Sequence, residues 1–274
     1  MIDRDLIKRA LAEDLQGGED ITSVATVSGS EKVVADFVSR KNGVVAGIDM
    51  ARAVLEEVGL SDIAVLVKDG TSVKAGDVLM TVRGDTRAIL LAERTALNFL
   101  GHLSGIATLT RTWVDAIAGT SCEIRDTRKT TPGMRLLEKY AVRMGGGTNH
   151  RMSLSDAALI KDNHIAAAGG VAEAFSKVRE KFPTSEIEIE VDTLDQLREV
   201  LPLKPDLVLL DNMSPAQCAE AVTIVSGATK LEASGGISLE NAKAYAVTGV
   251  NYLAIGALTH SAPVFDIGLD LRAE

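Results

Sequence analysis

The chain has 274 residues, which is enough for one large α/β domain or two smaller ones. Its net charge of −9 argues against a general nucleic-acid-binding protein. Aromatic residues make up only 3% of the sequence, so Ala, Val, Leu and Ile must build the core. That composition suits helices rich in small residues, packed on parallel strands.

Three features of the sequence bear on location. Cys122 and Cys218 fit no metal-binding spacing, so we expect two buried thiols in a reducing compartment. The N-terminal segment MIDRDLIKRALAEDL is amphipathic and carries acids, unlike a secretion signal. No apolar run reaches the roughly 18 residues of a membrane span. We therefore expect a cytoplasmic protein with no membrane partner.

The first hundred or so residues mix helices with short strands. Apolar periodicity predicts helices at Asp3–Asp14 and Met50–Val58, and strands at Lys32–Arg40, Ile63–Val67 and Val78–Val82. The turn DGTSVKAGD between the last two strands resembles the hairpins of lipoyl carrier domains, but a partner hairpin is missing, and a structural hairpin is the better interpretation. Thr86–Ala118 is then predicted to be mostly helical, with interruptions at Gly101 and Gly105.

From Ser121 onward, apolar runs alternate with helical stretches. The runs are SCEIRD, DAALIK, EIEIEV, DLVLLD, TKLEAS and NYLAIG, and the helices between them are Pro132–Met144, Val171–Lys181, Thr193–Leu201, Pro215–Ser226 and Leu239–Thr248. This alternation predicts parallel βα units, and six of them favour an incomplete barrel over an open sheet. Neither GxGxxG nor GxxxxGK[ST] occurs, so the two common nucleotide-binding turns are excluded.

Polar residues or glycines stand where each apolar run stops. In chain order they are Thr127, Arg128, Lys129, Lys161, Glu190, Asp211, Ser234, Gly235, Gly236 and Gly256. Active sites of β/α barrels lie at the carboxyl ends of the strands, so we expect these residues to converge on one pocket. A single polar strand end has an ordinary structural explanation, but six in succession do not.

The last two units carry glycine turns, Ser234-Gly235-Gly236 and Ile255-Gly256-Ala257. Glycines at such turns let backbone N–H groups approach a phosphate beside the N-terminus of the next helix. We therefore predict a phosphate site there.

Two carboxylates end neighbouring strands, Glu190 and Asp211. They suit ribose hydroxyls or a Mg²⁺ ion, and they equally suit an acid/base pair. The alternation of side chains in a strand also puts Glu188 and Asp192 on the face of Glu190. The position at the strand end favours Glu190.

A cationic segment, Arg125–His164, contains eight basic and four acidic residues, a balance of +4 inside an acidic chain. It predicts a site for a small polyanion such as a phosphate- or carboxylate-bearing metabolite. Within it, Thr131 and Pro132 predict a helix start. The charged residues that lie off the apolar stripe of this helix, and are expected to face solvent or a partner, are Arg135, Glu138, Lys139 and Arg143.

His150 and Arg151 follow the glycines that end this helix, Gly145–Gly147. A lone histidine is most often structural. Beside Arg151, however, His150 also fits a hydrogen-bond donor to a ligand carboxylate. No HxxxH or HxH pattern predicts a transition-metal site.

Taken in order, these motifs resemble the quinolinate phosphoribosyltransferase family. The matching stretches are TRKTTPG, GGGTNHR, LIKDNHI, EIEVDT, LLDN, EASGGI and YLAIGALTHS, with ERTALNFLGHLSGIAT and EDLQGGEDIT before them. The resemblance implies an α/β fold with an N-terminal α/β sandwich over residues 1–105, against which the tail 264–274 packs, and an incomplete β/α barrel over 106–263. A related molybdenum-locus protein shares much of this pattern, so the fold is better specified than the substrate.

The resemblance also implies a reaction and its residues. The reaction is Mg²⁺-dependent phosphoribosyl transfer from phosphoribosyl pyrophosphate to quinolinate, giving nicotinate mononucleotide, pyrophosphate and CO₂ in NAD biosynthesis. Residues implied for quinolinate are Thr127, Arg128, His150, Arg151 and Lys161. Those implied for phosphate groups are Lys129, Ser234, Gly235, Gly236, Ile255, Gly256 and Ala257. Glu190 and Asp211 are implied for the ribose and Mg²⁺, and together with Lys161 for catalysis. Arg94 is implied to enter the site of a neighbouring copy in a homodimer.

Two other classes remain open from the residues alone. One is a phosphate-handling barrel aldolase or isomerase, in which Lys161 would form a Schiff base. The other is a non-catalytic anion-binding or carrier protein.

Overall fold

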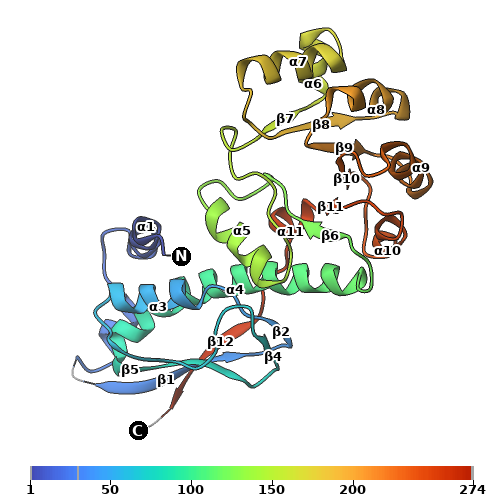
Figure 1. Ribbon diagram of the computed structural model, residues 1–274. Coiled ribbons are helices and arrows are strands. Elements are labelled where there is room, and N and C mark those ends of the chain that lie inside the picture. The colour runs from blue at the N-terminus through green and yellow to red at the C-terminus, as the bar shows by residue number, and fades with distance from the viewer. Residues whose placement is uncertain (1, 30, 273–274) are drawn as a thin grey trace. The chain divides into compact units, whose positions relative to one another are not determined.

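The computed structural model describes residues 2–29 and 31–272 (Figure 1). These residues form two compact units, which we describe separately. The first contains the described residues up to Arg111, the segment Leu137–Gly146 and the described residues from Ser261 onward. The second contains Thr112–Leu136 and Gly147–His260.

The first unit is built on an antiparallel sheet of four strands in the order β12-β1-β5-β3. The strands are β1 (Lys32–Ser39), β3 (Asp62–Val65), β5 (Val78–Asp85) and β12 (Ile267–Arg272), and a separate pair joins β2 (Gly43–Val44) to β4 (Ser72–Val73). The three strands predicted from alternation are confirmed. The chain end supplies β12, which pairs with β1 from Val34 to Ser39.

Four helices precede the second unit or lead into it: α1 (Arg4–Leu15), α2 (Ile21–Thr26), α3 (Ile48–Glu57) and α4 (Thr86–Ala116). The carboxylate of Asp3 accepts the N–H of Leu6 and caps α1. The helices predicted at Asp3–Asp14 and Met50–Val58 are confirmed to within two residues. The sequence reasoning missed α2, because six residues are too few to show a helical period.

The predicted interruptions of α4 are wrong, because the helix runs unbroken for 31 residues. Its glycines instead admit the backbone of the C-terminal segment, which runs past α4 into β12 (Figure 1). The carbonyl of Gly101 accepts the N–H of Phe265 at 3.0 Å. A Cβ at Gly105 would lie 2.1 Å from the carbonyl oxygen of Pro263.

The second unit is a six-stranded parallel sheet in the order β6-β11-β10-β9-β8-β7. The strands are β6 (Glu123–Arg125), β7 (Ala158–Ile160), β8 (Ile187–Val191), β9 (Leu207–Asp211), β10 (Lys230–Ser234) and β11 (Tyr252–Ala254). All six predicted strands are confirmed. The pairing runs from β6 to β7 without closing on itself within the described residues, so the barrel is open.

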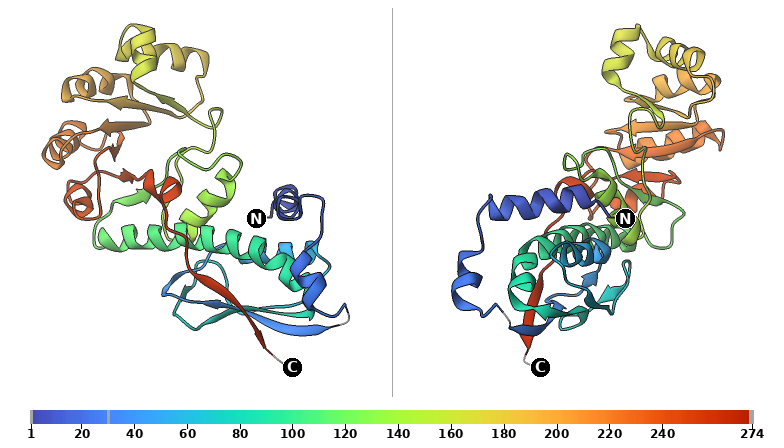
Figure 2. Two further views of the ribbon diagram at one scale, coloured as in Figure 1. Left: turned by 180° about the vertical axis from the view of Figure 1, so that it is seen from behind. Right: turned by 90° about the vertical axis from the view of Figure 1, so that its left-hand side faces the viewer.

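Helices α7 to α10 cover one face of this sheet (Figure 1 and Figure 2). The helices of the unit are α6 (Asp162–Ala168), α7 (Val171–Lys181), α8 (Leu194–Val200), α9 (Pro215–Val225), α10 (Ala242–Ala246) and α11 (Ala257–His260). Thr193 and Ser214 begin α8 and α9 in capping boxes with Gln196 and Gln217. Cys122 and Cys218 are buried free thiols, as predicted. Although α4 is long, no helix within the described ranges is apolar enough over a sufficient length to cross a membrane.

Helix α5 (Arg135–Met144) departs from two predictions. It begins three residues after Pro132, because Gly133 adopts a left-handed φ of +82° and ends the turn that Thr131 starts. Glu138 and Lys139 are fully buried, so the expectation that they face solvent or a partner is wrong. The ring of His102 on α4 lies 2.9 Å from the Glu138 carboxylate and gives it a polar partner that helical periodicity does not show.

We predict that Gly105→Ala lowers the free energy of unfolding by about 1–3 kcal/mol, because the new methyl group meets the backbone of Pro263. Urea denaturation of the variant measures this. Asn98→Ala, on the exposed side of the same helix, should change stability by less than about 0.5 kcal/mol. Equal stability of the two variants would contradict the close packing of α4.

Candidate active site

A cavity of about 280 Å³ opens at the carboxyl ends of the strands in the second unit. Its lining residues are Thr127, Arg128, Lys129, His150, Arg151, Leu159, Lys161, Leu209, Glu232, Ser234 and Ala254. The residues predicted at the ends of β6, β7 and β10 therefore meet at one place. The sequence reasoning did not identify the apolar part of the lining or Glu232. The size suits a small metabolite.

Two guanidinium groups, those of Arg128 and Arg151, line this cavity together with two lysines. The Nε atoms of Arg128 and Arg151 are both buried, with no hydrogen-bond partner among the described residues. Arg151 Nη1 donates to the carbonyl of Ala157 at 2.8 Å. Burial, and then the nearby charge of Arg128, lower the pKa of Arg151. Buried donors without acceptors are costly, so this pair is suited to receive an anion.

Three carboxylates cluster beside the cavity. Glu190 is the penultimate residue of β8, with its Oε2 3.1 Å from Lys161 Nζ, and Asp211 ends β9. Oxygens of Glu190, Asp192 and Asp211 lie within 4.8 Å of one another. Burial raises the pKa of Glu190, which Lys161 opposes, and burial together with Asp192 raises that of Asp211. Hard oxygen donors so arranged fit a Mg²⁺ ion.

The glycine turns lie at the ends of β10 and β11. Gly235 and Gly236 have φ of +86° and +63°, and a Cβ at Gly235 would lie 2.1 Å from Asn212 Oδ1. A Cβ at Gly256 would lie 3.2 Å from the Lys129 side chain. The Thr259 hydroxyl donates to the Lys129 carbonyl at 2.8 Å. The structure thus brings Lys129 to the turn at Gly256, and the phosphate that these residues are predicted to share stays a prediction.

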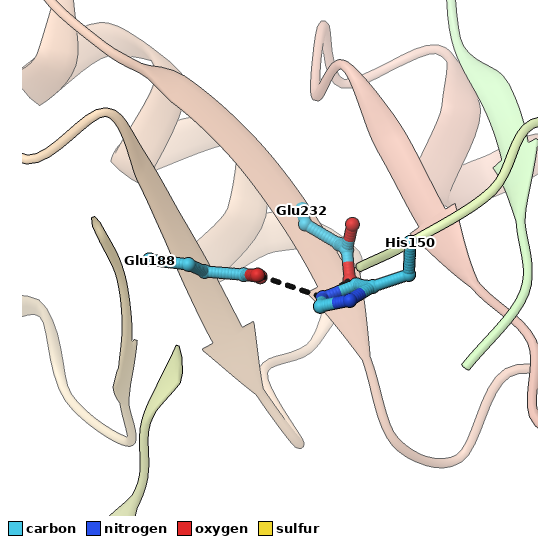
Figure 3. Close-up of side chains that lie close together, drawn as sticks. All are labelled: His150, Glu188 and Glu232. Carbon is cyan, nitrogen blue, oxygen red and sulfur yellow. Dashed lines mark ion pairs between the residues drawn. The ribbon is translucent and has the colours of Figure 1, made fainter. Parts of the chain in front are cut away.

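Beneath the cavity lies a buried cluster that we call the floor: His150, Glu188, Glu232 and Arg125. His150, Glu188 and Glu232 are 6%, 4% and 0% exposed. His150 Nε2 lies 2.7 Å from Glu188 Oε2 and 3.7 Å from Glu232 Oε1 (Figure 3). Arg125 Nη1 donates to Glu232 Oε2 at 2.8 Å.

Burial raises the pKa of both carboxyls of the floor. Burial raises the pKa of Glu188 to about 7, against the opposing charge of Arg125. Burial and the charge of Glu188 raise the pKa of Glu232 to about 7, against His150 and Arg125. The floor was not predicted as a unit, although glutamates inside the apolar runs EIEIEV and TKLEAS were a visible signal.

Comparison with known proteins decides the family. Residues 106–270 match the description "Quinolinate phosphoribosyl transferase, C-terminal domain", and residues 20–104 match the corresponding N-terminal domain. The chain belongs to the quinolinate phosphoribosyl transferase family.

Relatives within this family cover nearly the whole chain. The nicotinate-nucleotide pyrophosphorylase [carboxylating] of Mycobacterium leprae is 54% identical over 98% of this chain and 96% of its own length. The crystal structure of nicotinate-nucleotide pyrophosphorylase from Ehrlichia chaffeensis has a TM-score of 0.94 and 40% identity, covering 98% of both chains. The Francisella tularensis structure of the same name has a TM-score of 0.94 and 39% identity, covering 98% of this chain and 95% of its own.

One residue implied by the family pattern lies outside the second unit. Arg94 is exposed on α4 of the first unit. Its role at the site of a neighbouring copy stays a prediction.

The floor predicts a pH dependence of stability. The pKa values of Glu188 and Glu232 are raised from 4.5 to about 7, so between these two pH values the folded chain holds protons that the unfolded chain has lost. This difference stabilises the folded state. The stabilisation is complete below the unfolded pKa and disappears as pH rises through the folded pKa.

We expect Glu188→Gln to lose less stability than the wild type between about pH 5.5 and about pH 8, since a neutral amide replaces one of the two titrating groups. The midpoint of urea denaturation at both pH values measures this. Glu199→Gln, exposed on α8, is the control and should follow the wild type. If Glu188→Gln also follows it, the raised pKa values are wrong.

Proposed function

We propose that this chain transfers the phosphoribosyl group of phosphoribosyl pyrophosphate to the ring nitrogen of quinolinate, with loss of CO₂, in NAD biosynthesis. The observation that carries the proposal is the pair Arg128 and Arg151, whose buried Nε donors have no acceptor within the described residues. Quinolinate brings two adjacent carboxylates on a flat ring, and guanidinium groups suit carboxylates geometrically. The printed names of the relatives denote this reaction.

The other residues of the site divide between the two substrates. Thr127 and Lys161 line the cavity with the two arginines and would complete the dicarboxylate site. Lys129 lies against the turn at Gly256, and Ser234 begins the turn Gly235-Gly236. These groups, with the backbone of Ile255–Ala257, would hold the phosphates of the second substrate.

The bond changes need mainly positioning. The lone pair of the ring nitrogen forms a bond to the anomeric carbon as the bond from that carbon to pyrophosphate breaks. The bond to the 2-carboxylate then breaks, CO₂ leaves, and its electron pair stays on a carbon next to the positively charged nitrogen. A proton from solvent replaces the carboxylate. The fixed cations would hold both reactants in line and stabilise the departing charge.

Lys161 would act through electrostatics and not through covalent catalysis. Its Nζ is 3.1 Å from Glu190 Oε2, so the amine is engaged by a carboxylate at the edge of the cavity. An amine held in an ion pair is not the free nucleophile that a Schiff base requires, which argues against the aldolase alternative. Glu190 and Asp211 would accept hydrogen bonds from the ribose hydroxyls.

We further propose that Mg²⁺ binds with the second substrate at Glu190 and Asp211, whose oxygens cluster with those of Asp192. A divalent cation there neutralises charge on the leaving pyrophosphate. We propose a homodimer in which Arg94 reaches the neighbouring site, on the basis of the family pattern and of its exposure on α4. The buried free thiols support a reducing compartment such as the cytoplasm.

We predict that Arg128→Ala and Lys161→Ala each lower kcat/KM by about 100-fold or more while the fold is retained, because each removes a charge from the reacting groups. Formation of nicotinate mononucleotide and CO₂ from quinolinate, phosphoribosyl pyrophosphate and Mg²⁺ is measured, with a chelated sample beside it. Arg198→Ala is the control, since this exposed side chain pairs with the surface acids Asp195 and Glu220 and is not part of the cavity lining. A wild-type protein that forms no product would refute the function, and an active Lys161→Ala would refute the assigned role.

A further inference from the structure

The segment 147–157 carries two residues of the cavity but has almost no regular structure. Between α5 and β7 its one backbone link to the sheet, within the described residues, is the bridge of Thr148 to Arg125. His150 and Arg151 follow this bridge and line the cavity. Other contacts must therefore fix their positions.

Carboxylates that rise from the sheet supply these contacts. Asp126, directly after β6, accepts the backbone N–H of His150 at 2.8 Å. Glu188 on β8 and Glu232 on β10 approach the imidazole ring, and both point toward it (Figure 3). The backbone and the ring of one residue are thus held from separate strands.

The hydrogen bonds also define the tautomer of His150. The backbone N–H of Arg151 donates to Nδ1 at 2.8 Å, so Nδ1 carries a lone pair. The proton therefore sits on Nε2, which donates to Glu188 Oε2 at 2.7 Å. A continuous link runs from β8 through the imidazole to the peptide group of Arg151.

We propose that Glu188 is a positioning residue for Arg151. By accepting Nε2–H it holds the imidazole in the one orientation in which Nδ1 can accept the N–H of Arg151, and so it fixes where that guanidinium enters the cavity. His150 then acts through its ring as a spacer and not as a donor to the ligand carboxylate. The kinetic test of this inference, which measures KM for quinolinate, rests on the proposed function. The NMR test of the His150 tautomer does not.

The chemistry of β8 supports such a role. All five residues of β8 are buried, and Glu188 does not line the cavity. An apolar side chain would occupy the site without the cost of desolvating a carboxylate. The second carboxylate oxygen of Glu188, Oε1, is buried with no hydrogen-bond partner among the described residues. The burial of Glu188 is therefore only partly compensated by hydrogen bonds. The 2.7 Å contact with His150 is the short polar contact that a leucine at this position would lose, whereas Arg125 and Arg151 act on Glu188 as nearby charges.

The test compares Glu188→Leu, which removes the acceptor, with Glu188→Gln, which keeps an acceptor oxygen at the same reach. We expect Glu188→Leu to raise KM for quinolinate by about tenfold or more, the size of one lost buried hydrogen bond, and to leave KM for phosphoribosyl pyrophosphate within about twofold. Glu188→Gln should restore most of the quinolinate affinity. Glu186→Leu, exposed and next to the same strand, is the matched control and should change neither KM.

A ¹⁵N-histidine NMR spectrum of the wild-type protein provides a readout independent of activity and of the folding of any Glu188 variant. The chain has four histidines, and the spectrum of His150→Gln identifies the signals of His150. We expect a neutral ring protonated at Nε2. A ring protonated at Nδ1, an unchanged quinolinate KM in Glu188→Leu, or equal increases in both KM values would each overturn the proposal. A wild-type protein inactive with both substrates would instead refute the proposed function and leave the NMR result as the test of Glu188.

Discussion

The balance between buried carboxylates and the cations beside them is the constraint on which this site depends. Glu232 pairs with Arg125, Glu188 accepts the Nε2–H of His150, and Glu190 pairs with Lys161. Each of these three carboxylates has a cation or an imidazole as its partner, and the Nε donors of Arg128 and Arg151 are left without acceptors in the described chain. The site is therefore prepared for an anion before the anion arrives, which is how fixed charges gain catalytic value.

The parallel sheet makes this arrangement possible. Strand β8 alternates Glu188 and Glu190 on its inner face, so one strand contributes both to the floor and to the acidic cluster. Neighbouring strands end level with one another, as Asp211 and Ser234 do. Side chains from distant parts of the sequence thereby reach one cavity, and Gly256 leaves room beside the side chain of Lys129.

Local sequence patterns predicted much of this fold and site. The features that they missed depend on contacts between residues far apart in the sequence. The six apolar runs became the six strands, and the residues at their ends include most of the polar cavity lining, because both follow from local alternation. The unbroken α4, the buried Glu138 and the role of Glu232 were missed. Each of these features depends on a partner elsewhere in the chain, and no sequence period links such partners. Gly105 packs against the backbone of Pro263. The carboxylate of Glu138 contacts His102, and that of Glu232 accepts a hydrogen bond from Arg125.

Hydrogen exchange of the backbone amides of His150 and Arg151, measured by NMR without any ligand, tests most directly whether the site is preorganised. Both amides belong to an irregular segment, yet they donate to Asp126 and to the ring of His150. The account predicts that they exchange as slowly as amides inside β8 and β10, since their opening requires the floor to come apart. Exchange at the rate of an open loop, with protection appearing only when quinolinate is added, would contradict it.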